Sequence, residues 1–424
     1  MVSAVLPDGT LVESIQESAD AQTALVIAKG GEIKIVSDWT DSGIRYVPIS
    51  AGHNLLKHRA IKLPGAPQEY GTVEVLFSEI ERYAIRYLSL SPAFLKIVTT
   101  YVLLSWVYDA FNELPYLRFR GDYGSGKTRA LIVFGSITYK GFFASGASTV
   151  SPIFHTLDAF KGTLIFDEAD FRFTDEKAEL VKILNNGNVR GFSVLRTQVT
   201  AAKEFEPRAF AVYGPKIVGM RGSYEDRALE SRFLTEEMSG RSLRADIPIS
   251  LPEAQEAEAH TLRSKLLMYR LRERASARID AALADPGLEP RMNQILLPLL
   301  SVAPNEEVRD AIRSYATQVQ EGIVSDRAGS TEGQLLAVIA GLAIADEKCV
   351  LPLQEIVTAF ALRFGDEYDR PITNRFLGGV LRNRLGLPLY KTKGVIAASL
   401  KDRARLTALF TRYGVGESEW KSAA

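Results

Sequence analysis

The feature that most constrains the fold is a glycine-rich segment at residues 121–128, GDYGSGKT. It fits the pattern G-x-x-x-x-G-K-[ST] and lies between a strand-like run at 116–120 and a helix-like run at 127–137. Such a loop wraps phosphate oxygens with its backbone N–H groups, so glycines are needed where a side chain would block that approach. Lys127 is predicted to neutralise the β- and γ-phosphates of ATP, and the Thr128 hydroxyl to ligate Mg²⁺. The predicted nucleotide contacts in this segment are Gly121, Asp122, Tyr123, Gly124, Ser125, Gly126, Lys127 and Thr128.

The second motif is an apolar strand-like run that ends in carboxylates. Residues 163–166, TLIF, lead directly into Asp167 and Glu168. Asp167 is predicted to hold Mg²⁺ through water, and Glu168 to orient or deprotonate the attacking water. Asp170 is either part of this network or a solvated loop acid. The letters DEAD at 167–170 also suggest a two-lobed RNA helicase, but that class needs a second similar lobe, and the chain that follows is helical.

Strand-like and helix-like runs alternate from residue 116 to residue 238. This alternation predicts an α/β fold with a mainly parallel sheet flanked by helices. The expected strands are 116–120, 141–145, 163–167, a run within 209–220, and 232–238, and the expected helices are 127–137, 149–161 and 175–186.

These motifs, together with YGPKIVGMRGSYEDRALESRF at 213–233, resemble AAA+ ATPases, and in particular the minichromosome-maintenance-like helicases of bacterial mobile elements and phages. The resemblance covers roughly residues 95–424 and is strongest at 113–235. It implies an AAA+ P-loop core with a parallel sheet, a helical lid and a C-terminal winged-helix domain. It also implies an ATP-driven ring, usually a hexamer, with nucleotide at each subunit boundary.

The resemblance assigns one arginine to the neighbouring subunit's nucleotide. Arg232 is similar to the arginine finger that reaches the γ-phosphate across the boundary, where such a residue is worth ~10³–10⁵ in rate. The alternative is a surface arginine paired with Glu230 or Glu225, and Arg227 is the reserve candidate for the finger.

At two positions where the resembling family has residues that sense the bound nucleotide, this sequence fits the family pattern less well. Met220 stands where many relatives have a small polar residue, and a thioether cannot position a water, so either Arg221 takes this role or the feature is absent. Arg291 opens the helix RMNQILLPLL as the second sensor arginine of the family does, and it is expected to contact the nucleotide. Arg263 competes for this role, and a helix-capping or surface ion pair is the alternative for Arg291.

Two β-prone runs around a loop at 188–210 predict a hairpin. It resembles the pre-sensor hairpin that ring helicases project into their central channel. Lys203, near the tip, is the candidate contact to a phosphate of single-stranded DNA, and Arg196 is the second. The alternative is an ordinary solvated lysine. Such a channel would grip the backbone by charge without reading sequence.

The C-terminal segment 370–412 carries ten lysines and arginines but one acid, Asp402. Helices expected at 353–365 and 372–386, followed by a strand–turn–strand pattern, suit a winged helix-turn-helix. The alternative is a winged fold that serves only protein contacts or ring regulation. The candidate DNA contacts are Arg375, Arg382, Arg384, Lys391 and Lys393.

Composition excludes several classes. The 51 basic and 51 acidic residues balance, so only a local basic patch can bind a polyanion. The single cysteine, Cys349, excludes an intramolecular disulfide, and the four histidines show no ligand spacing. The apolar stretch 97–108 is shorter than the ~20 residues of a membrane span and predicts a buried helix. The first residues lack a signal-peptide layout. We therefore expect a cytoplasmic protein without membrane contacts.

The expected domains are a small β-containing N-terminal module at 1–72, a helical linker at 73–112, the AAA+ core at 113–245, the lid at 246–328 and the winged-helix domain at 329–424. The predicted function is an ATP-dependent, ring-forming DNA helicase or translocase in the replication of a mobile element or phage. Its predicted partners are DNA, further copies of the chain, and a primase or initiator protein. The alternatives are an AAA+ switch that loads, remodels or regulates a nucleoprotein partner without unwinding DNA, and an assembly protein that barely hydrolyses ATP.

Overall fold

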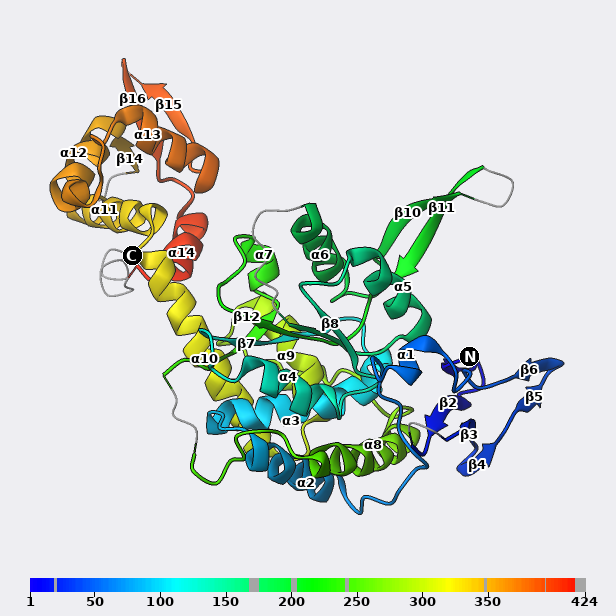
Figure 1. Cartoon of the computed structure of the whole chain (residues 1–424). Helices are drawn as coiled ribbons and strands as arrows, with labels where there is room; N and C mark the ends of the chain where they lie inside the picture. Colours follow the sequence, from blue (N-terminus) through cyan, green and yellow to red (C-terminus); the bar gives the residue numbers. More distant parts are fainter. Residues whose placement is uncertain are drawn as a thin grey trace. The chain divides into compact units, whose positions relative to one another are not determined.

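The computed structural model describes residues 1–18, 21–167, 175–199, 204–240, 244–346, 349–392 and 394–415. The chain divides into two compact units, Met1–Tyr315 and Ala316–Ala424. Their elements are labelled in Figure 1.

The first 50 residues form antiparallel β-structure. Gly30 and Gly31 have φ of 58° and 86°, so the turn between residues 29 and 32 closes a tight hairpin that requires glycine. The four-stranded sheet has the order β1-β2-β3-β4, and a separate hairpin and a short helix follow it. The bounds are β1 Ser3–Val5, β2 Leu11–Gln16, β3 Thr23–Lys29, β4 Glu32–Val36, β5 Trp39–Asp41, β6 Ile44–Tyr46 and α1 Asn54–Lys57.

A five-stranded sheet lies at the centre of the first unit, and its order is β13-β7-β12-β9-β8. Every pairing in it is parallel, which confirms the predicted mainly parallel α/β core. Buried aromatic and aliphatic side chains from the strands and helices pack against both faces. The strands are β7 Tyr116–Arg120, β8 Phe142–Ser145, β9 Leu164–Asp167, β12 Lys216–Met220 and β13 Phe233–Glu237, and the connecting helices are α4 Lys127–Gly135, α5 Val150–Phe160, α6 Asp175–Asn186 and α7 Arg227–Glu230.

Longer helices cover this core, and the most apolar of them is buried. The stretch Pro92–Ala110 has the length and mean hydropathy of a membrane span, but 72% of its apolar window is buried inside the fold, as in the core helix of a soluble protein. The helix packs against three other helices, at Val73–Tyr87, Glu253–Glu273 and Pro290–Val302. The bounds are α2 Val73–Tyr87, α3 Pro92–Val107, η1 Tyr108–Ala110, α8 Glu253–Glu273, η2 Ala281–Leu283, α9 Pro290–Val302 and α10 Glu306–Ala328.

The predicted hairpin is present as an arm that projects from the first unit (Figure 1). Its strands are β10, Ser193–Val199, and β11, Phe205–Ala211. They pair antiparallel from Ser193 opposite Ala211 to Val199 opposite Phe205. They form a two-stranded sheet of their own, which packs against α5 and α6.

The second unit has its own apolar core, which includes Leu336, Ile339, Phe360 and Leu381. Its three-stranded sheet has the order β14-β16-β15. The helix expected at 372–386 begins at Asn374, because the Thr373 side chain caps it by accepting from the backbone N–H of Phe376. The elements are α11 Thr331–Asp346, β14 Val350–Pro352, α12 Leu353–Phe364, η3 Gly365–Glu367, α13 Asn374–Gly379, η4 Val380–Arg384, β15 Leu389–Thr392, β16 Val395–Ser399 and α14 Arg403–Arg412.

Candidate active site

The glycine-rich loop leaves the carboxyl end of β7 and enters α4 at Lys127. Gly124 and Gly126 have φ of 72° and 90°, a left-handed backbone that favours glycine. A Cβ on Gly121 would lie 2.8 Å from Ser125 Oγ. In the sheet β7 is flanked by β12 and β13, so the chain crosses in opposite directions from β7 and from β12. The carboxyl end of a sheet at such a switch point is where α/β proteins bind ligands.

Lys127 folds back onto the loop. Its Nζ donates to the carbonyl oxygens of Gly121 at 2.6 Å and of Asp122 at 2.7 Å. The backbone N–H of Asp122 in turn donates to Ser239 Oγ at 3.0 Å, a support from the end of β13 that sequence reasoning missed. The loop therefore combines a positive charge with a helix N-terminus, which together suit a polyphosphate.

The predicted metal ligands meet. Thr128 Oγ1 donates to Asp167 Oδ2 at 2.6 Å, which joins the start of α4 to the end of β9. Gly219 of β12 gives this carboxylate room, because a Cβ there would lie 2.9 Å from Asp167 Oδ1 and 2.9 Å from a methyl of Leu131. A hydroxyl and a carboxylate are the oxygen donors that Mg²⁺ prefers.

In the described part of the chain, no group of three or more His, Cys, Asp or Glu side chains could hold a metal ion alone. A Mg²⁺ at Thr128 and Asp167 would therefore complete its coordination with phosphate oxygens and water, as is usual for this ion. The residues present fit a magnesium–nucleotide complex better than a free metal.

Of the two first-sensor candidates, Arg221 is the one beside the loop. Met220 is 3% exposed. The Arg221 guanidinium donates to the Tyr123 hydroxyl and lies 4.4 Å from the centre of the Tyr123 ring. Tyr123 itself is 81% exposed. The Arg221–Tyr123 pair therefore lies at the accessible side of the loop, whereas Met220 is buried.

Arg232 does not pair with Glu230, the alternative that the sequence left open. Glu230 accepts from Arg118 of β7 at 2.7 Å, and although burial opposes ionisation, this bond and the arginine charge lower the pKa of Glu230. Arg232 instead donates to Asn185 Oδ1 at 2.5 Å and to the Ala228 carbonyl at 3.1 Å. Its Nε is buried without a hydrogen-bond partner among the described residues.

Arg232 lies at the opposite end of the sheet from the loop. Its carbonyl accepts from the Tyr116 N–H at 2.8 Å, so it flanks the amino end of β7, whereas the loop follows the carboxyl end. Five residues of strand separate the two ends by about 16 Å at ~3.3 Å per residue. Burial, followed by the like charge of Arg291, lowers the pKa of Arg232. Arg291 is thus near enough to Arg232 for its charge to be felt there, and its own guanidinium donates to Gln294 of α9.

The predicted DNA contacts are dispersed. Arg196 donates to Glu179 of α6 and lies 5.1 Å from the centre of the Phe154 ring, so its side chain is engaged with the body. Arg384 pairs with Glu332 at 3.0 Å. Of the candidate contacts in the second unit, Arg375, Arg382, Arg384 and Lys391 are all exposed. Outside the described residues lie Glu168, Asp170, Lys203 and Lys393.

No protein-family model and no curated protein matches the chain. Among solved structures, the C-terminal region of NrS-1 is 11% identical and aligns over 92% of this chain and 96% of its own, with a TM-score of 0.39. The SCCmec type IV Cch, described as an active helicase, is 12% identical over 96% of this chain and 80% of its own, with a TM-score of 0.42. The Orc1 protein of Aeropyrum pernix in complex with DNA is 14% identical over 79% and 96%, with a TM-score of 0.22. All three likenesses are weak.

Proposed function

We propose that the chain is an AAA+-type ATPase that acts on DNA. The observation that carries this proposal is the contact of Thr128 with Asp167, 2.6 Å between two oxygens from separate elements beside a phosphate-type loop. This pairing supports a magnesium–ATP site because it offers hard oxygen ligands where the loop would present the phosphates. Mg²⁺, when bound, would neutralise charge that develops on the phosphate oxygens.

The chain's own groups then divide the work. The loop N–H groups and Lys127 hold and orient the phosphates, while Asp167 positions the metal and its water shell. By resemblance Glu168 orients or deprotonates the attacking water. These groups explain how the phosphates are positioned and how the water is activated. The negative charge that develops around the γ-phosphate in the transition state must then be stabilised by another cation.

We assign that cation to a second copy of the chain. Arg232 lies at the far end of the sheet from its own loop, has no ion-pair partner among the described residues, and lies beside Arg291. These three features support a pair of arginines that contacts the neighbouring subunit's nucleotide. A finger of this kind lowers the barrier by about 4–7 kcal/mol, the equivalent of ~10³–10⁵ in rate.

The same arrangement supports a ring, with six subunits as in the resembling family, that moves single-stranded DNA through its channel. In this proposal the hairpin arm, with Lys203 near its tip, faces the strand. Residues 329–424 act as a winged-helix domain whose Arg375, Arg382, Lys391 and Lys393 contact DNA. The setting we propose is replication of a mobile element or phage, with a primase or initiator as partner.

One observation favours a regulatory switch as the second candidate. Met220 is buried where a water-positioning residue is expected, which is compatible with slow hydrolysis that times a partner's loading and not steady unwinding. Strand displacement separates the two functions.

The test measures ATP hydrolysis with and without single-stranded DNA, and displacement of a labelled strand from a fork. We expect DNA-stimulated hydrolysis, which Lys127→Ala abolishes, and unwinding that requires ATP and Mg²⁺. Arg129→Ala, adjacent to the loop but bonded to the Pro248 carbonyl at 2.6 Å, is the matched control for loss of a cation in α4. Hydrolysis that persists in Lys127→Ala would contradict the site, and hydrolysis without unwinding would favour the switch.

A further inference from the structure

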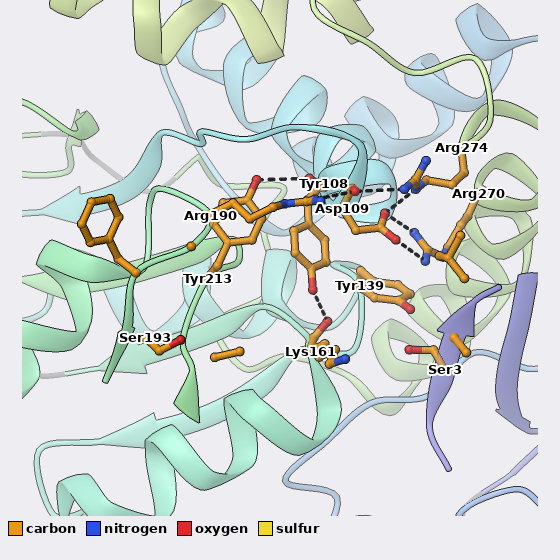
Figure 2. A pocket seen from close by; sticks show the side chains of 15 residues that line it. Ser3, Tyr108, Asp109, Tyr139, Lys161, Arg190, Ser193, Tyr213, Arg270 and Arg274 are labelled. Atoms are coloured by element: carbon orange, nitrogen blue, oxygen red, sulfur yellow. Dashed lines mark hydrogen bonds and ion pairs between the residues drawn. The ribbon is translucent and has the colours of Figure 1, made fainter. Parts of the chain in front are cut away.

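A cavity of about 400 Å³ lies at the end of the core opposite to the glycine-rich loop. Its walls come from six parts of the first unit: the edge strand β1, the segment around η1, the end of α8, the base of the hairpin arm, Tyr139 between α4 and β8, and Lys161 just after α5 (Figure 2). None of the residues assigned to the nucleotide site lines it.

The lining carries an excess of positive charge. Four of its side chains are cationic, Lys161, Arg190, Arg270 and Arg274, and the single acidic one is Asp109. Asp109 is already shared, since it accepts from Arg270 Nη1 at 2.8 Å and from Arg274 Nε at 2.8 Å. Although burial opposes its ionisation, these arginines lower the pKa of Asp109 to about 2, so it stays ionised. Arg270 Nε also donates to the buried Glu13 at 2.7 Å, so both arginines have carboxylate partners and the excess charge rests on Lys161 and Arg190.

The outer cations have no carboxylate partner among the described residues. Arg190 donates from Nη2 to the Asp109 carbonyl at 2.6 Å and lies 5.4 Å from the centre of the Tyr213 ring. Lys161 contributes only its carbonyl, which accepts from the Tyr108 hydroxyl at 2.7 Å, and no bond from its Nζ is found there. Figure 2 labels Arg190, Lys161 and Arg274 among the side chains that line the cavity. Arg274 is already paired with Asp109, so an anion beside Arg190 and Lys161 would meet the charge that no carboxylate among the described residues compensates.

The edge strand adds backbone donors on the same side. The Ser14 N–H donates to the Val2 carbonyl and the Leu6 N–H to the Thr10 carbonyl, so alternate residues of β1 face its partner β2. In antiparallel pairing the residues between them, Ser3 and Val5, direct their N–H and C=O groups the other way. Both line the cavity. Unpaired N–H groups beside guanidinium groups are suited to phosphate oxygens.

We propose that this cavity binds the phosphate group of a nucleotide, either free or within a nucleic-acid strand. The cations and the β1 edge would hold the phosphate, and the aromatic walls formed by Tyr108, Tyr213 and Phe192 would accept the sugar and base. A volume of about 400 Å³ is in the range of small-ligand sites. The site is separate from the ATP site and does not depend on hydrolysis.

Occupancy would connect the N-terminal sheet to the hairpin arm. Ser3 and Val5 belong to the first strand of the chain, whereas Arg190 and Ser193 belong to the base of the arm. A ligand bonded to both would add a restraint between the N-terminal sheet and the arm, whose existing contacts with the body include Arg196 with Glu179 of α6 and the Ala211 N–H with Asp158 of α5. The site therefore offers a way for a phosphate ligand to adjust how the arm engages its own target.

The experiment uses the full chain carrying Lys127→Ala, so that binding at the loop and failure of the proposed ATPase do not affect the result. Binding of inorganic phosphate, AMP and a decathymidylate is measured by calorimetry. We expect AMP or the oligonucleotide to bind, with inorganic phosphate competing. Adding Lys161→Gln together with Arg190→Gln should weaken binding at least tenfold. Ser193→Trp, which fills the cavity and removes no charge, should do the same.

Lys57→Gln, which removes an exposed charge from α1, is the matched control and should bind normally. Preference for AMP identifies a free nucleotide as the ligand, and preference for the oligonucleotide identifies a strand. Absence of binding by all three probes, lack of competition by inorganic phosphate, or equal affinity in all variants would overturn the proposal. Circular dichroism of each variant checks that it is folded.

Discussion

At the scale of single residues, Gly219 shows how a position without a side chain controls a site. It lies on β12, beside the carboxylate that ends β9. Asp167 could be predicted from its place after an apolar run, but Gly219 could not, because only the pairing of the two strands brings them together.

Gly219→Ala is predicted to raise the Mg²⁺ concentration needed for half-maximal ATP hydrolysis. The added methyl would lie 2.9 Å from Asp167 Oδ1, so the carboxylate must shift away from Thr128. Overpacking against Leu131 should also cost about 1–3 kcal/mol of stability. Gly222→Ala, where a Cβ meets nothing within 4 Å, is the control. An unchanged Mg²⁺ dependence would show that Asp167 does not hold the metal.

Lys216 is a buried cation that sequence reasoning also missed. Its Nζ donates to the carbonyls of Val212 at 2.8 Å, Gly214 at 3.0 Å and Gly187 at 3.1 Å. It therefore joins the end of α6 to the exit of the hairpin arm. Burial lowers the pKa of Lys216 to about 7. Nothing local in the sequence distinguishes it from a surface lysine.

This pKa predicts a pH dependence of stability. The unfolded chain holds the proton up to about pH 10.5, the ordinary lysine value, whereas the folded chain releases it near pH 7. Between these values the unfolded state binds more protons, so the free energy of unfolding rises with pH by up to about 1.4 kcal/mol per unit. Below pH 7 both states are protonated and this contribution is flat. In Lys216→Met this contribution should disappear and the profile should become flatter, while the buried Lys140, whose pKa is lowered by burial to about 8, keeps its own rise.

The measurement is urea unfolding between pH 7 and 9.5, with Lys57→Met as the exposed-lysine control. Other groups titrate in this range, but they do so equally in all three proteins. Parallel profiles for the native chain and Lys216→Met would contradict the assignment.

At the scale of elements, the hairpin arm has two unlike faces. Leu195, Val199 and Phe205 lie on one face and are 66%, 62% and 79% exposed. On the other face Arg196 and Arg208 are directly opposite each other, and their charges lie over aromatic rings. The arm therefore exposes an apolar face, while Arg196 faces the body.

Phe205→Ser is predicted to weaken binding of single-stranded DNA. Stacking of a base on an exposed ring is worth about 1–3 kcal/mol, or roughly 5- to 150-fold in affinity. Fluorescence anisotropy with an oligonucleotide measures the loss. Ile44→Ser removes a 57% exposed side chain from β6 and should bind normally. Equal losses in both variants would mean that the arm is not the contact.

Much of the element level could be predicted because its signals are local. The strands β7 and β9 and the loop between β7 and α4 follow from short apolar runs and glycines, and the arm from two β-prone runs. The position of Arg291 could not, since the packing of α9 and the helices around it decides which end of the sheet that arginine approaches. The two faces of the arm were equally hidden, because they depend on strand register.

At the scale of the whole molecule, buried charges fix the N-terminal sheet to the core. Glu13 of β2 is 1% exposed and pairs with Arg270 of α8 at 2.7 Å and with Lys140 at 3.2 Å. These partners lie more than 100 residues away in the sequence. The sheet thus belongs to the compact unit Met1–Tyr315, which the β-rich composition of its residues did not indicate.

Mixing two inactive variants tests the shared site. Lys127→Ala lacks a working loop and Arg232→Ala lacks the finger, so each alone should hydrolyse almost no ATP. In a random equal mixture, about a quarter of head-to-tail boundaries combine an intact loop with an intact Arg232. Hydrolysis should therefore recover to about that fraction of the native rate. No recovery on mixing, or full activity of Arg232→Ala alone, would contradict catalysis between subunits.

Because the strands of the central sheet are all parallel, the two ends of the sheet differ and each copy of the chain is polar. The loop and Arg232 lie at opposite ends of those strands, so in the head-to-tail contacts that we propose each copy offers its loop to one neighbour and its Arg232 to the other. A closed ring of such contacts has two unlike sides. In the ring that we propose, a DNA strand in the channel meets the same side of every subunit, so each ATP hydrolysis drives it in the same direction.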